Sequence, residues 1–324
     1  MTQTPTSLST PVTSRPGSRI AAVGHYLPAA TLDNEELGRS CGVEAEWIRS
    51  RTGIERRHIA APGETVVDMA VAAAEKALAS AGVDRSSIDT VITATSTAAT
   101  TIPSAAAQVA ARLELAHPAA FDLNTACAGF CYALACADSL IRSGTSTNVL
   151  VVAADKSTAW VDRAERDTAI LFGDGAGAVL VTPSPTRDIG PVVWGSIGEH
   201  AEVIGISERD LMLHQDGRAV FRWAISLAPI ARRACEAGGI SPEGLTAFIP
   251  HQANLRIIDA LAKSLAPGDA VVATDVTESG NTIAATVPIA LSKLVERGHL
   301  AAGGPVLLFG FGAGLAYAGQ VVNF

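Results

Sequence analysis

The sequence predicts an α/β fold built from two similar halves. Short runs rich in Val, Ile and Thr alternate with longer Ala-rich stretches, and this alternation is typical of buried sheets covered by helices. Two local similarities connect the halves: residues 81–92 align with 238–249, an offset of about 157 residues, and residues 172–180 align with 309–317. Because both similarities occur in the same order, we expect duplicated halves that meet near residues 183–190, with a site at their junction.

Local composition predicts the individual elements. Strands are expected at Ile20–Val23, Thr90–Thr95, Ala119–Leu123, Asn148–Ala153, Ala178–Thr182, Phe248–Ile249, Ala270–Val272 and Val306–Phe309. Helices are expected at Val66–Ser80, Ser104–Arg112, Gly129–Arg142, Val220–Ala237, Leu255–Ser264 and Thr286–Arg297. Each half is expected to close with a Gly-rich turn that leads into a strand.

The boundaries follow from these patterns. Residues 1–17 are rich in Ser, Thr and Pro and lack the apolar stretch of a signal peptide, so we expect a disordered tail. The N-terminal half is expected to cover residues 18–185, and the C-terminal half residues 186–324.

Composition excludes several classes of function. A net charge of −8 without long basic runs argues against nucleic-acid binding, and no apolar stretch is long enough to predict a membrane span. Apolar residues make up 48% of the chain and charged residues only 17%, so we expect extensive burial between halves or subunits. Five cysteines, an odd number, without a signal sequence predict free thiols in a reducing cytoplasm.

Cys127 is the candidate nucleophile. It follows a predicted strand and stands where a helix is expected to begin, so the helix dipole and unpaired N–H groups would favour a thiolate. The Cys127 N–H would also point toward a developing oxyanion. The alternative is a buried cysteine that packs as a small hydrophobic residue, which is the role expected for Cys131, Cys136, Cys41 and Cys235. No cluster of further ligands supports a metal site.

His251 and Asn281 are the candidate partners of Cys127. His251 directly follows a predicted strand of the second half, and α/β proteins place their chemistry at such positions. Asn281 lies in a Gly-Asn turn before a helix, where its alternative role is a helix cap. A papain-type protease also uses Cys, His and Asn, but its surroundings at the cysteine and its disulfides differ.

Seven motifs in order resemble one family. They are Glu46-Trp-Ile48, Arg51-Thr-Gly-Ile54, Ala126-Cys-Ala-Gly-Phe130, Phe172-Gly-Asp-Gly-Ala-Gly177, His251-Gln-Ala-Asn-Leu-Arg256, Gly280-Asn-Thr282 and Gly310-Phe-Gly-Ala-Gly314. From about Arg19 to Phe324 the chain resembles the β-ketoacyl-acyl-carrier-protein synthase III family of condensing enzymes. The resemblance implies a thiolase-like fold, in which two βαβαβαββ halves form five αβαβα layers.

The resemblance also implies a reaction. Cys127 accepts an acyl group from acyl-CoA, and malonyl-acyl-carrier-protein then enters the same tunnel. His251 and Asn281 stabilise the enolate formed by decarboxylation, and this carbanion attacks the acyl-Cys127 thioester. The backbone N–H groups of Cys127 and Ala313 form an oxyanion hole. Members of the family work as homodimers without a resident cofactor or metal. Their reaction initiates fatty acid biosynthesis.

Binding residues follow from the same resemblance. The residues expected to hold CoA and its pantetheine arm are Trp47, Arg51, Arg166, Gly217, Phe221 and Asn254. The residues expected to dock the acyl carrier protein are Gln252, Ala253, Leu255 and Arg256. Ile102 and Phe311 are expected at the acyl pocket, Ile102 across the dimer. Because Ile102 is small and branched, we expect the pocket to tolerate branched acyl groups of four or five carbons besides acetyl. The alternative roles are core packing for Trp47 and surface ion pairs for Arg51 and Arg166.

Other functions share these motifs. A priming synthase of an aromatic polyketide pathway would use the same chemistry with a different carrier protein. A family acyltransferase that acts on alcohols tends to lose the His or Asn, and a non-catalytic subunit loses the Cys. A degradative thiolase needs a second cysteine that is absent from Gly310–Gly314. A dinucleotide fingerprint at Gly173–Gly177 is disfavoured because a strand, rather than a helix, is expected after it.

Overall fold

Two five-stranded mixed sheets form the framework of this computed structural model, which describes residues 16–300 and 303–324. The strands of the N-terminal sheet are, in spatial order, β1 (Gly17–Tyr26), β7 (Asp174–Ser184), β6 (Val149–Lys156), β4 (Thr90–Ala94) and β5 (Ala119–Leu123). Those of the C-terminal sheet are β12 (Val271–Val272), β11 (Ala247–Pro250), β13 (Pro305–Gly312), β14 (Ala316–Asn323) and β8 (Val193–Gly195).

The two sheets share one topology. In the N-terminal sheet β4 runs parallel to β5 and β6, and β7 runs antiparallel to β6 and β1. In the C-terminal sheet β11 runs parallel to β12 and β13, and β14 runs antiparallel to β13 and β8. The predicted duplication of the chain is therefore confirmed strand by strand.

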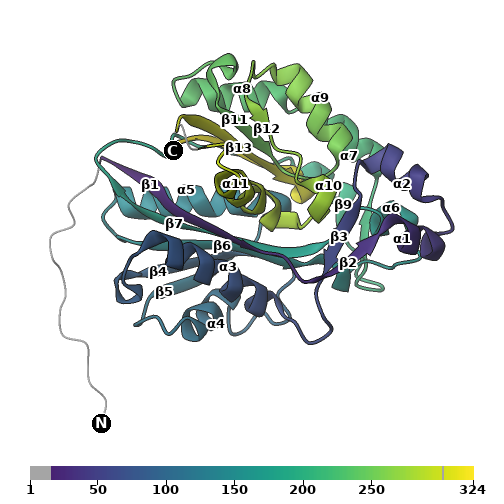
Figure 1. The fold of residues 1–324 in the computed structure, drawn as a ribbon, viewed down its shortest axis with the longest axis horizontal. Coiled ribbons are helices and arrows are strands. Elements are labelled where there is room, and N and C mark those ends of the chain that lie inside the picture. Colours follow the sequence, from purple (N-terminus) through teal and green to yellow (C-terminus); the bar gives the residue numbers. More distant parts are fainter. Residues whose placement is uncertain (1–15, 301–302) are drawn as a thin grey trace, which may run out of the picture.

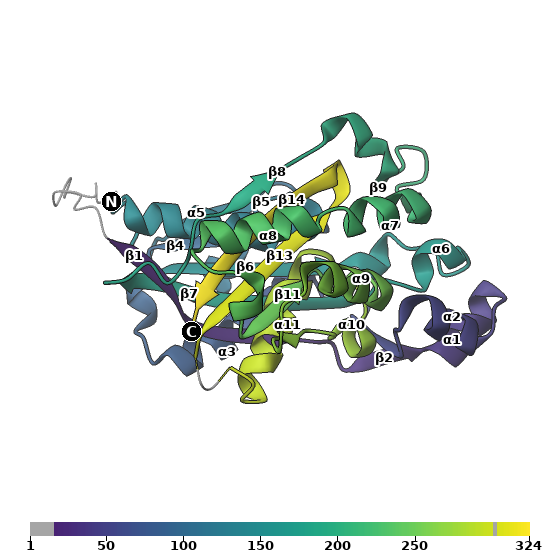
Figure 2. The same cartoon turned by 90° about the horizontal axis from the view of Figure 1, so that it is seen from above.

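Five layers result from the stacking of these sheets with helices (Figure 1). α5 (Gly129–Arg142) and α11 (Thr286–Glu296) lie between the sheets, and each packs against strands of both. α3 (Val66–Ala81) and α4 (Ala105–Arg112) cover the outer face of the N-terminal sheet, at the bottom of Figure 1. α8 (Ala228–Ala237) and α9 (Leu255–Leu265) lie on the opposite outer side, as the second view also shows (Figure 2).

Sequence composition explains the central layer. Nearly every residue of α11 is buried, as expected for a helix that contacts a sheet on each side. Small residues allow close approach: a Cβ on Gly177 of β7 would lie 2.7 Å from the Pro288 Cβ on α11. The glycines of the 173–177 segment thus serve helix–sheet packing.

Additional elements cluster at one end of the molecule, on the right of Figure 1. They are β2 (Ala30–Asp33), α1 (Asn34–Cys41), α2 (Ala45–Thr52), β3 (Arg56–Ile59), α6 (Arg166–Ala169), β9 (Ile204–Ile206), β10 (Leu213–Gln215), α7 (Gly217–Ile225) and α10 (Val276–Ser279). Among the described residues, no helix combines the length and apolar character that a membrane span requires.

Three predictions need correction. The single helix expected at Val220–Ala237 is two helices, α7 and α8, because Pro229 in the first turn of α8 has no N–H to continue a preceding helix. Residues 172–180 run into β7 itself, whereas residues 309–317 span the end of β13, a turn and the start of β14, so this pair is not structurally equivalent. Of the expected tail, residues 1–15 lie outside the described residues, and Gly17 already begins β1.

Candidate active site

A cavity of about 1040 Å³ is lined by residues of both halves. It brings together most of the predicted site residues: Trp47, Arg51, Cys127, Arg166, Gly217, Phe221, His251, Ala253, Asn254, Arg256, Asn281, Phe311 and Ala313. Ile102, Gln252 and Leu255 are not among its lining residues.

A strained turn carries Cys127 into this cavity. The residue lies on a short 3₁₀ turn, η2 (Ala126–Ala128), between β5 and α5. Ala126 has a φ of 46°, a left-handed conformation that is uncommon for a residue with a Cβ. The Asn124 Oδ1 supports this turn by accepting a hydrogen bond of 3.1 Å from the Ala126 N–H. The chain therefore reverses sharply just before α5, which begins at Gly129 as predicted, and Cys127 lies in the turn that leads into the helix.

Glycines at the end of β13 leave room for the Cys127 side chain. A Cβ on Gly312 would lie 2.6 Å from the Cys127 Cβ and 2.9 Å from its Sγ, so any larger residue there would displace the thiol. This close approach brings the Ala313 N–H to the Cys127 sulfur, where it acts together with the N–H of Cys127 itself. Both N–H groups lower the pKa of the thiol.

Burial, however, has the larger effect on Cys127. Part of the side chain faces the cavity, but the surrounding protein withdraws the sulfur from solvent. Burial, together with a smaller effect of the nearby Asp155 carboxylate, raises the pKa of the Cys127 thiol to about 12. The N–H groups favour a thiolate, as expected, but desolvation outweighs them, and the resting group is a thiol.

His251 is held from two directions. Its backbone N–H donates to the Phe309 carbonyl oxygen at 2.7 Å, and its Nδ1 lies 2.8 Å from the Thr286 Oγ1. The imidazole also meets the Phe311 ring edge to face, with 5.3 Å between the ring centroids. Burial lowers the pKa of His251 to about 3, so the ring is neutral at physiological pH, and Nε2 is left for a ligand.

Asn281 is fixed by its own backbone and side chain. Its N–H donates to the Leu171 carbonyl oxygen at 2.9 Å, and its carbonyl oxygen accepts from the Gly173 N–H at 3.0 Å. The side-chain Oδ1 accepts from the Ile283 N–H at 2.9 Å. Asn281 is not a helix cap, because Thr282 precedes the 3₁₀ turn Ile283–Ala285 and Ala285 precedes α11. Its side chain lines the cavity and leaves Nδ2 as a donor.

A second cluster lies at the mouth of the cavity. The Arg51 guanidinium carbon is 4.6 Å from the centroid of the Trp47 ring, and that of Arg166 is 5.9 Å away. The Asn254 Nδ2 donates to the Arg51 carbonyl oxygen at 3.3 Å. The Arg256 guanidinium lies 5.8 Å from the Phe221 ring. An aromatic surface with several fixed positive charges suits a planar, phosphorylated ligand.

One of the predicted docking residues does not fit its expected place. Gln252 has an exposed fraction of 0%, because its amide is hydrogen-bonded entirely within the protein, so its side chain is withdrawn from any docking surface. Ile102 is 87% exposed and stays outside the cavity of its own chain. Leu255 is half-buried and packs against the turn at Gly53.

Two residues that hold the site in place, Asp155 and Thr286, were not predicted from the sequence. Asp155 is buried at the end of β6 and accepts hydrogen bonds of 2.9 Å from the N–H groups of Ser96 and Ala284, so it joins the two halves. Burial raises its pKa to about 6. The sequence did contain a signal for Asp155, because a carboxylate at the end of an otherwise apolar strand is unusual. Thr286 offered no signal, because its contact with His251 spans 35 residues.

The raised pKa of Cys127 predicts how the free enzyme reacts with an alkylating agent. Because the thiol is protonated at rest, we expect the rate of alkylation by iodoacetamide to rise steadily from pH 7 to pH 10, without a plateau. Mass spectrometry of the Cys127 peptide measures this rate, with the Cys127→Ser variant as the control. A plateau with a midpoint below pH 8 would instead show that the helix terminus outweighs burial.

Known family models and proteins match most of this chain. A model described as 3-oxoacyl-[acyl-carrier-protein] synthase III matches residues 121–198, and the model of its C-terminal region matches residues 235–324. The chain is 53% identical to β-ketoacyl-[acyl-carrier-protein] synthase III 2 of Streptomyces avermitilis, over 95% of this chain and 99% of the relative. It is 52% identical to synthase III 4 of Streptomyces coelicolor, over 95% and 98%.

Solved structures extend the similarity to the whole fold. The priming β-ketosynthase of a polyketide biosynthetic pathway is 43% identical, with a TM-score of 0.94 over 98% of this chain and 99% of that chain. The 3-oxoacyl-[acyl-carrier-protein] synthase III of Aquifex aeolicus is 38% identical, with a TM-score of 0.91 over 95% and 100%. The chain therefore belongs to the β-ketoacyl-[acyl-carrier-protein] synthase III family of thiolase-fold condensing enzymes, which are acyltransferases.

Proposed function

We propose that this chain condenses an acyl-CoA primer with malonyl-acyl-carrier-protein through an acyl-Cys127 intermediate and thereby initiates fatty acid biosynthesis. The observation that carries the proposal is the single cavity lined by Cys127, His251 and Asn281 together with the predicted CoA residues. A nucleophile, two hydrogen-bond donors and a binding surface for the substrate are the groups that such a reaction requires.

Acylation of Cys127 comes first. The sulfur attacks the thioester carbonyl carbon of acyl-CoA, and the thiol proton passes to the departing CoA thiolate. The backbone N–H groups of Cys127 and Ala313 bind the oxyanion of the tetrahedral intermediate. Since the thiol is protonated at rest, proton loss accompanies the attack.

Decarboxylation and condensation follow. The bond between the carboxylate and the α-carbon of the malonyl group breaks, CO2 leaves, and the electron pair forms an enolate. His251 Nε2–H and Asn281 Nδ2–H donate to the enolate oxygen, and the carbanion then attacks the acyl-Cys127 carbonyl and releases the thiolate. A neutral His251 donates through Nε2 when the Thr286 hydroxyl donates to its Nδ1, across the 2.8 Å contact, in place of the Ile283 carbonyl oxygen at 3.1 Å.

CoA would enter past the cluster at the mouth. We assign Trp47 to the adenine and Arg51 and Arg166 to the phosphates, because aromatic and guanidinium planes stack on adenine and bind phosphate. Gly217, Phe221 and Asn254 would line the path of the pantetheine arm. Each of these residues lines the cavity.

The carrier protein would dock beside the same mouth. Ala253, Leu255 and Arg256 form the proposed docking segment, without the buried Gln252. Arg256 is exposed and lies close to Phe221, so a phosphopantetheine arm bound there could reach the cavity. A local positive charge would attract an acidic carrier protein despite the net charge of −8 on the chain.

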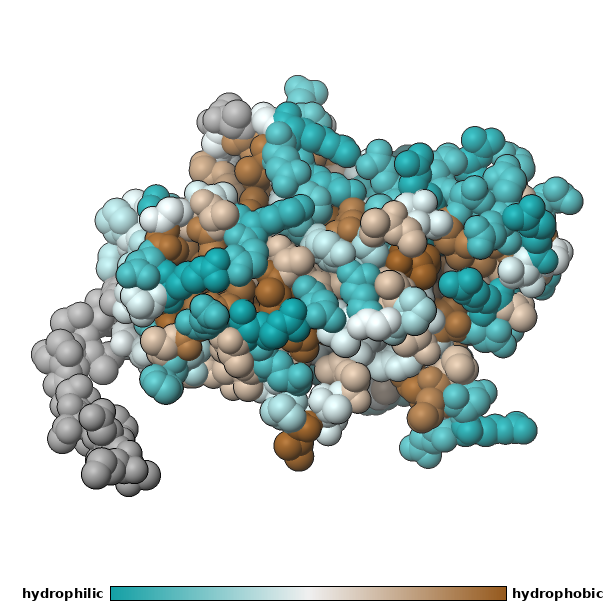
Figure 3. Space-filling model, turned by 60° about the horizontal axis from the view of Figure 1, so that its bottom comes forward, coloured by the Kyte–Doolittle hydropathy of each residue, from teal (hydrophilic) through white to brown (hydrophobic). Residues whose placement is uncertain are grey.

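We propose that the chain acts as a homodimer in the cytoplasm. β5 lies at the edge of the N-terminal sheet, where unpaired backbone groups favour pairing with another strand. Phe121 on β5 is 39% exposed and Ile102 is 87% exposed, and Figure 3 shows apolar side chains reaching the surface between polar ones on this side. Pairing through β5 would let Ile102 reach the acyl pocket of the partner, next to Phe311. The free cysteines suit a reducing compartment.

Priming of a polyketide pathway is the second candidate. It is favoured by the similarity to the priming β-ketosynthase at 43% identity. The two candidates share their chemistry and differ in the carrier protein, so condensation rates with the malonyl forms of a fatty acid carrier protein and a polyketide carrier protein separate them.

The proposed roles predict a separation of the two half-reactions. Intact-mass spectrometry after incubation with acyl-CoA should detect an acyl adduct in the wild type, His251→Ala and Asn281→Ala proteins, and no adduct in Cys127→Ala. Decarboxylation of malonyl-acyl-carrier-protein should fall by about 10²-fold or more in the two variants that lose a donor to the enolate. If the adduct persists in Cys127→Ala, or if both donor variants decarboxylate normally, the assignment is refuted.

Ile102 predicts the choice of primer. Because isoleucine fills less space than an aromatic residue, the enzyme should accept isobutyryl-CoA at least as well as acetyl-CoA. Rates of acyl-Cys127 formation with the two substrates measure this, and Ile102→Phe should shift the preference toward acetyl-CoA. Strict preference of the wild-type enzyme for acetyl-CoA would contradict the prediction.

A further inference from the structure

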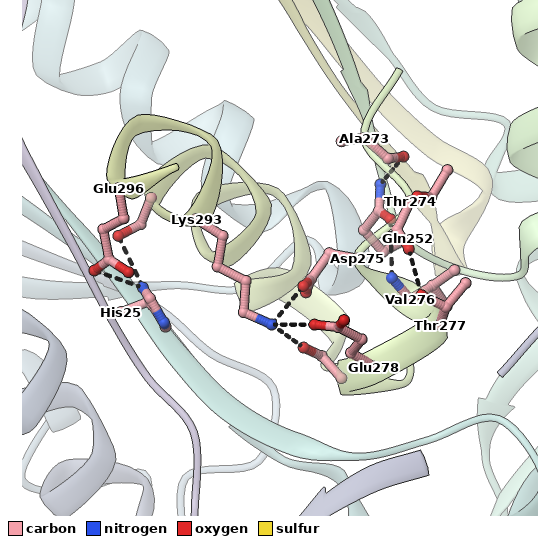
Figure 4. Close-up of polar contacts among 12 residues, drawn as sticks. His25, Gln252, Ala273, Thr274, Asp275, Val276, Thr277, Glu278, Lys293 and Glu296 are labelled. Carbon is pink, nitrogen blue, oxygen red and sulfur yellow. Dashed lines mark hydrogen bonds and ion pairs between the residues drawn. The ribbon is translucent and has the colours of Figure 1, made fainter. Parts of the chain in front are cut away.

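Gln252 forms a bridge between three segments of the C-terminal half. Its Nε2 donates to the carbonyl oxygens of Pro250, at 2.7 Å, and Ala273, at 3.1 Å. Its Oε1 accepts from the N–H of Val276 at 3.1 Å. Figure 4 shows the Gln252 side chain between the end of β12 and the start of α10. The amide thus uses its two donors and an acceptor without any contact to solvent.

The partners of Gln252 lead directly to the two predicted donors. Pro250 immediately precedes His251 at the end of β11, and Val276 begins α10, whose last residue, Ser279, is followed by Gly280 and Asn281. Gly280 has a φ of 71°, and a Cβ there would lie 2.9 Å from the Arg57 Cγ. Since this link is short and closely packed, a shift of the α10 start would be passed on to Asn281.

α11 supports the same arrangement from the other side. The Lys293 Nζ bonds to the Asp275 Oδ1 at 2.5 Å and to the Ser279 Oγ at 2.9 Å, at the two ends of α10 (Figure 4). Thr286, in the first turn of α11, contacts the His251 Nδ1. α11 therefore contacts both the segment that carries His251 and the segment that leads to Asn281. Gln252 connects these two segments directly to each other.

From these hydrogen bonds we propose that Gln252 is a positioning residue that sets the separation between His251 and Asn281. It contacts neither the nucleophile nor the cavity. Acylation of Cys127 uses neither of the two donors, whereas decarboxylation needs both of them at one oxygen. A small misplacement of catalytic groups costs about 10²-fold in rate. Loss of the bridge therefore slows decarboxylation selectively.

The test compares half-reactions in Gln252→Met, which keeps the volume and removes the hydrogen bonds, and in Gln252→Glu, which keeps the acceptor for Val276. We expect near-normal acyl-Cys127 formation from acyl-CoA in both variants, measured by intact mass. The kcat for decarboxylation of malonyl-acyl-carrier-protein should fall by about 10²-fold in Gln252→Met and by less in Gln252→Glu, with little change in KM.

The matched control is Gln320→Met. Gln320 is also fully buried, but neither polar atom of its side chain has a hydrogen-bond partner among the residues that the structure describes, so both half-reactions should stay normal in this variant. Equal loss of both half-reactions in the two Gln252 variants, or normal decarboxylation in Gln252→Met, would overturn the proposal.

A reference variant separates this inference from the proposed function on which it rests. If His251→Ala decarboxylates normally, the assignment of the donors fails. If His251→Ala is impaired and Gln252→Met is not, the assignment stands and only the positioning role of Gln252 fails.

Discussion

The packing of α5 and α11 between two sheets is the constraint on which the site depends. The turns that precede these helices, η2 and η6 (Ile283–Ala285), contact each other. A Cβ on Gly129, the first residue of α5, would lie 3.3 Å from the Cβ of Ala284. Each turn also contains a non-glycine residue with positive φ, 46° at Ala126 and 52° at Ile283. Duplication has thus placed equivalent turns face to face, one with Cys127 and the other following Asn281.

Burial in the interior gives the site its electrostatic character. Both Cys127 and His251 are neutral at rest, because desolvation raises the pKa of the thiol and lowers that of the imidazole. Neutral hydrogen-bond donors in a low-dielectric site stabilise a developing oxyanion strongly and need no rearrangement when charge appears. The pKa of Asp155 is raised to about 6, and the charge of this nearby carboxylate disfavours a thiolate at Cys127.

Local signals explain what could be predicted from the sequence. The predicted strands were found because buried strands are continuous apolar runs, and the proline in the first turn of α8 marked the helix break that the prediction missed. Cys127, His251 and Asn281 stand out because each follows a strand or a Gly-containing turn. The residues that hold them were not predictable, because their contacts join distant segments: 24 residues separate Gln252 from Val276, and 129 separate Asp155 from Ala284.

The contact between the two helix ends is tested most directly by a double-mutant cycle with Gly129→Ala and Ala284→Gly, read out as the rate of the complete condensation. A methyl group on Gly129 would crowd Ala284, so Gly129→Ala should slow the reaction and added Ala284→Gly should restore part of the rate. We predict a coupling of at least about 0.5 kcal/mol between the two substitutions. Strictly additive effects would contradict the claim that the packing of these helix ends sets the geometry of the site.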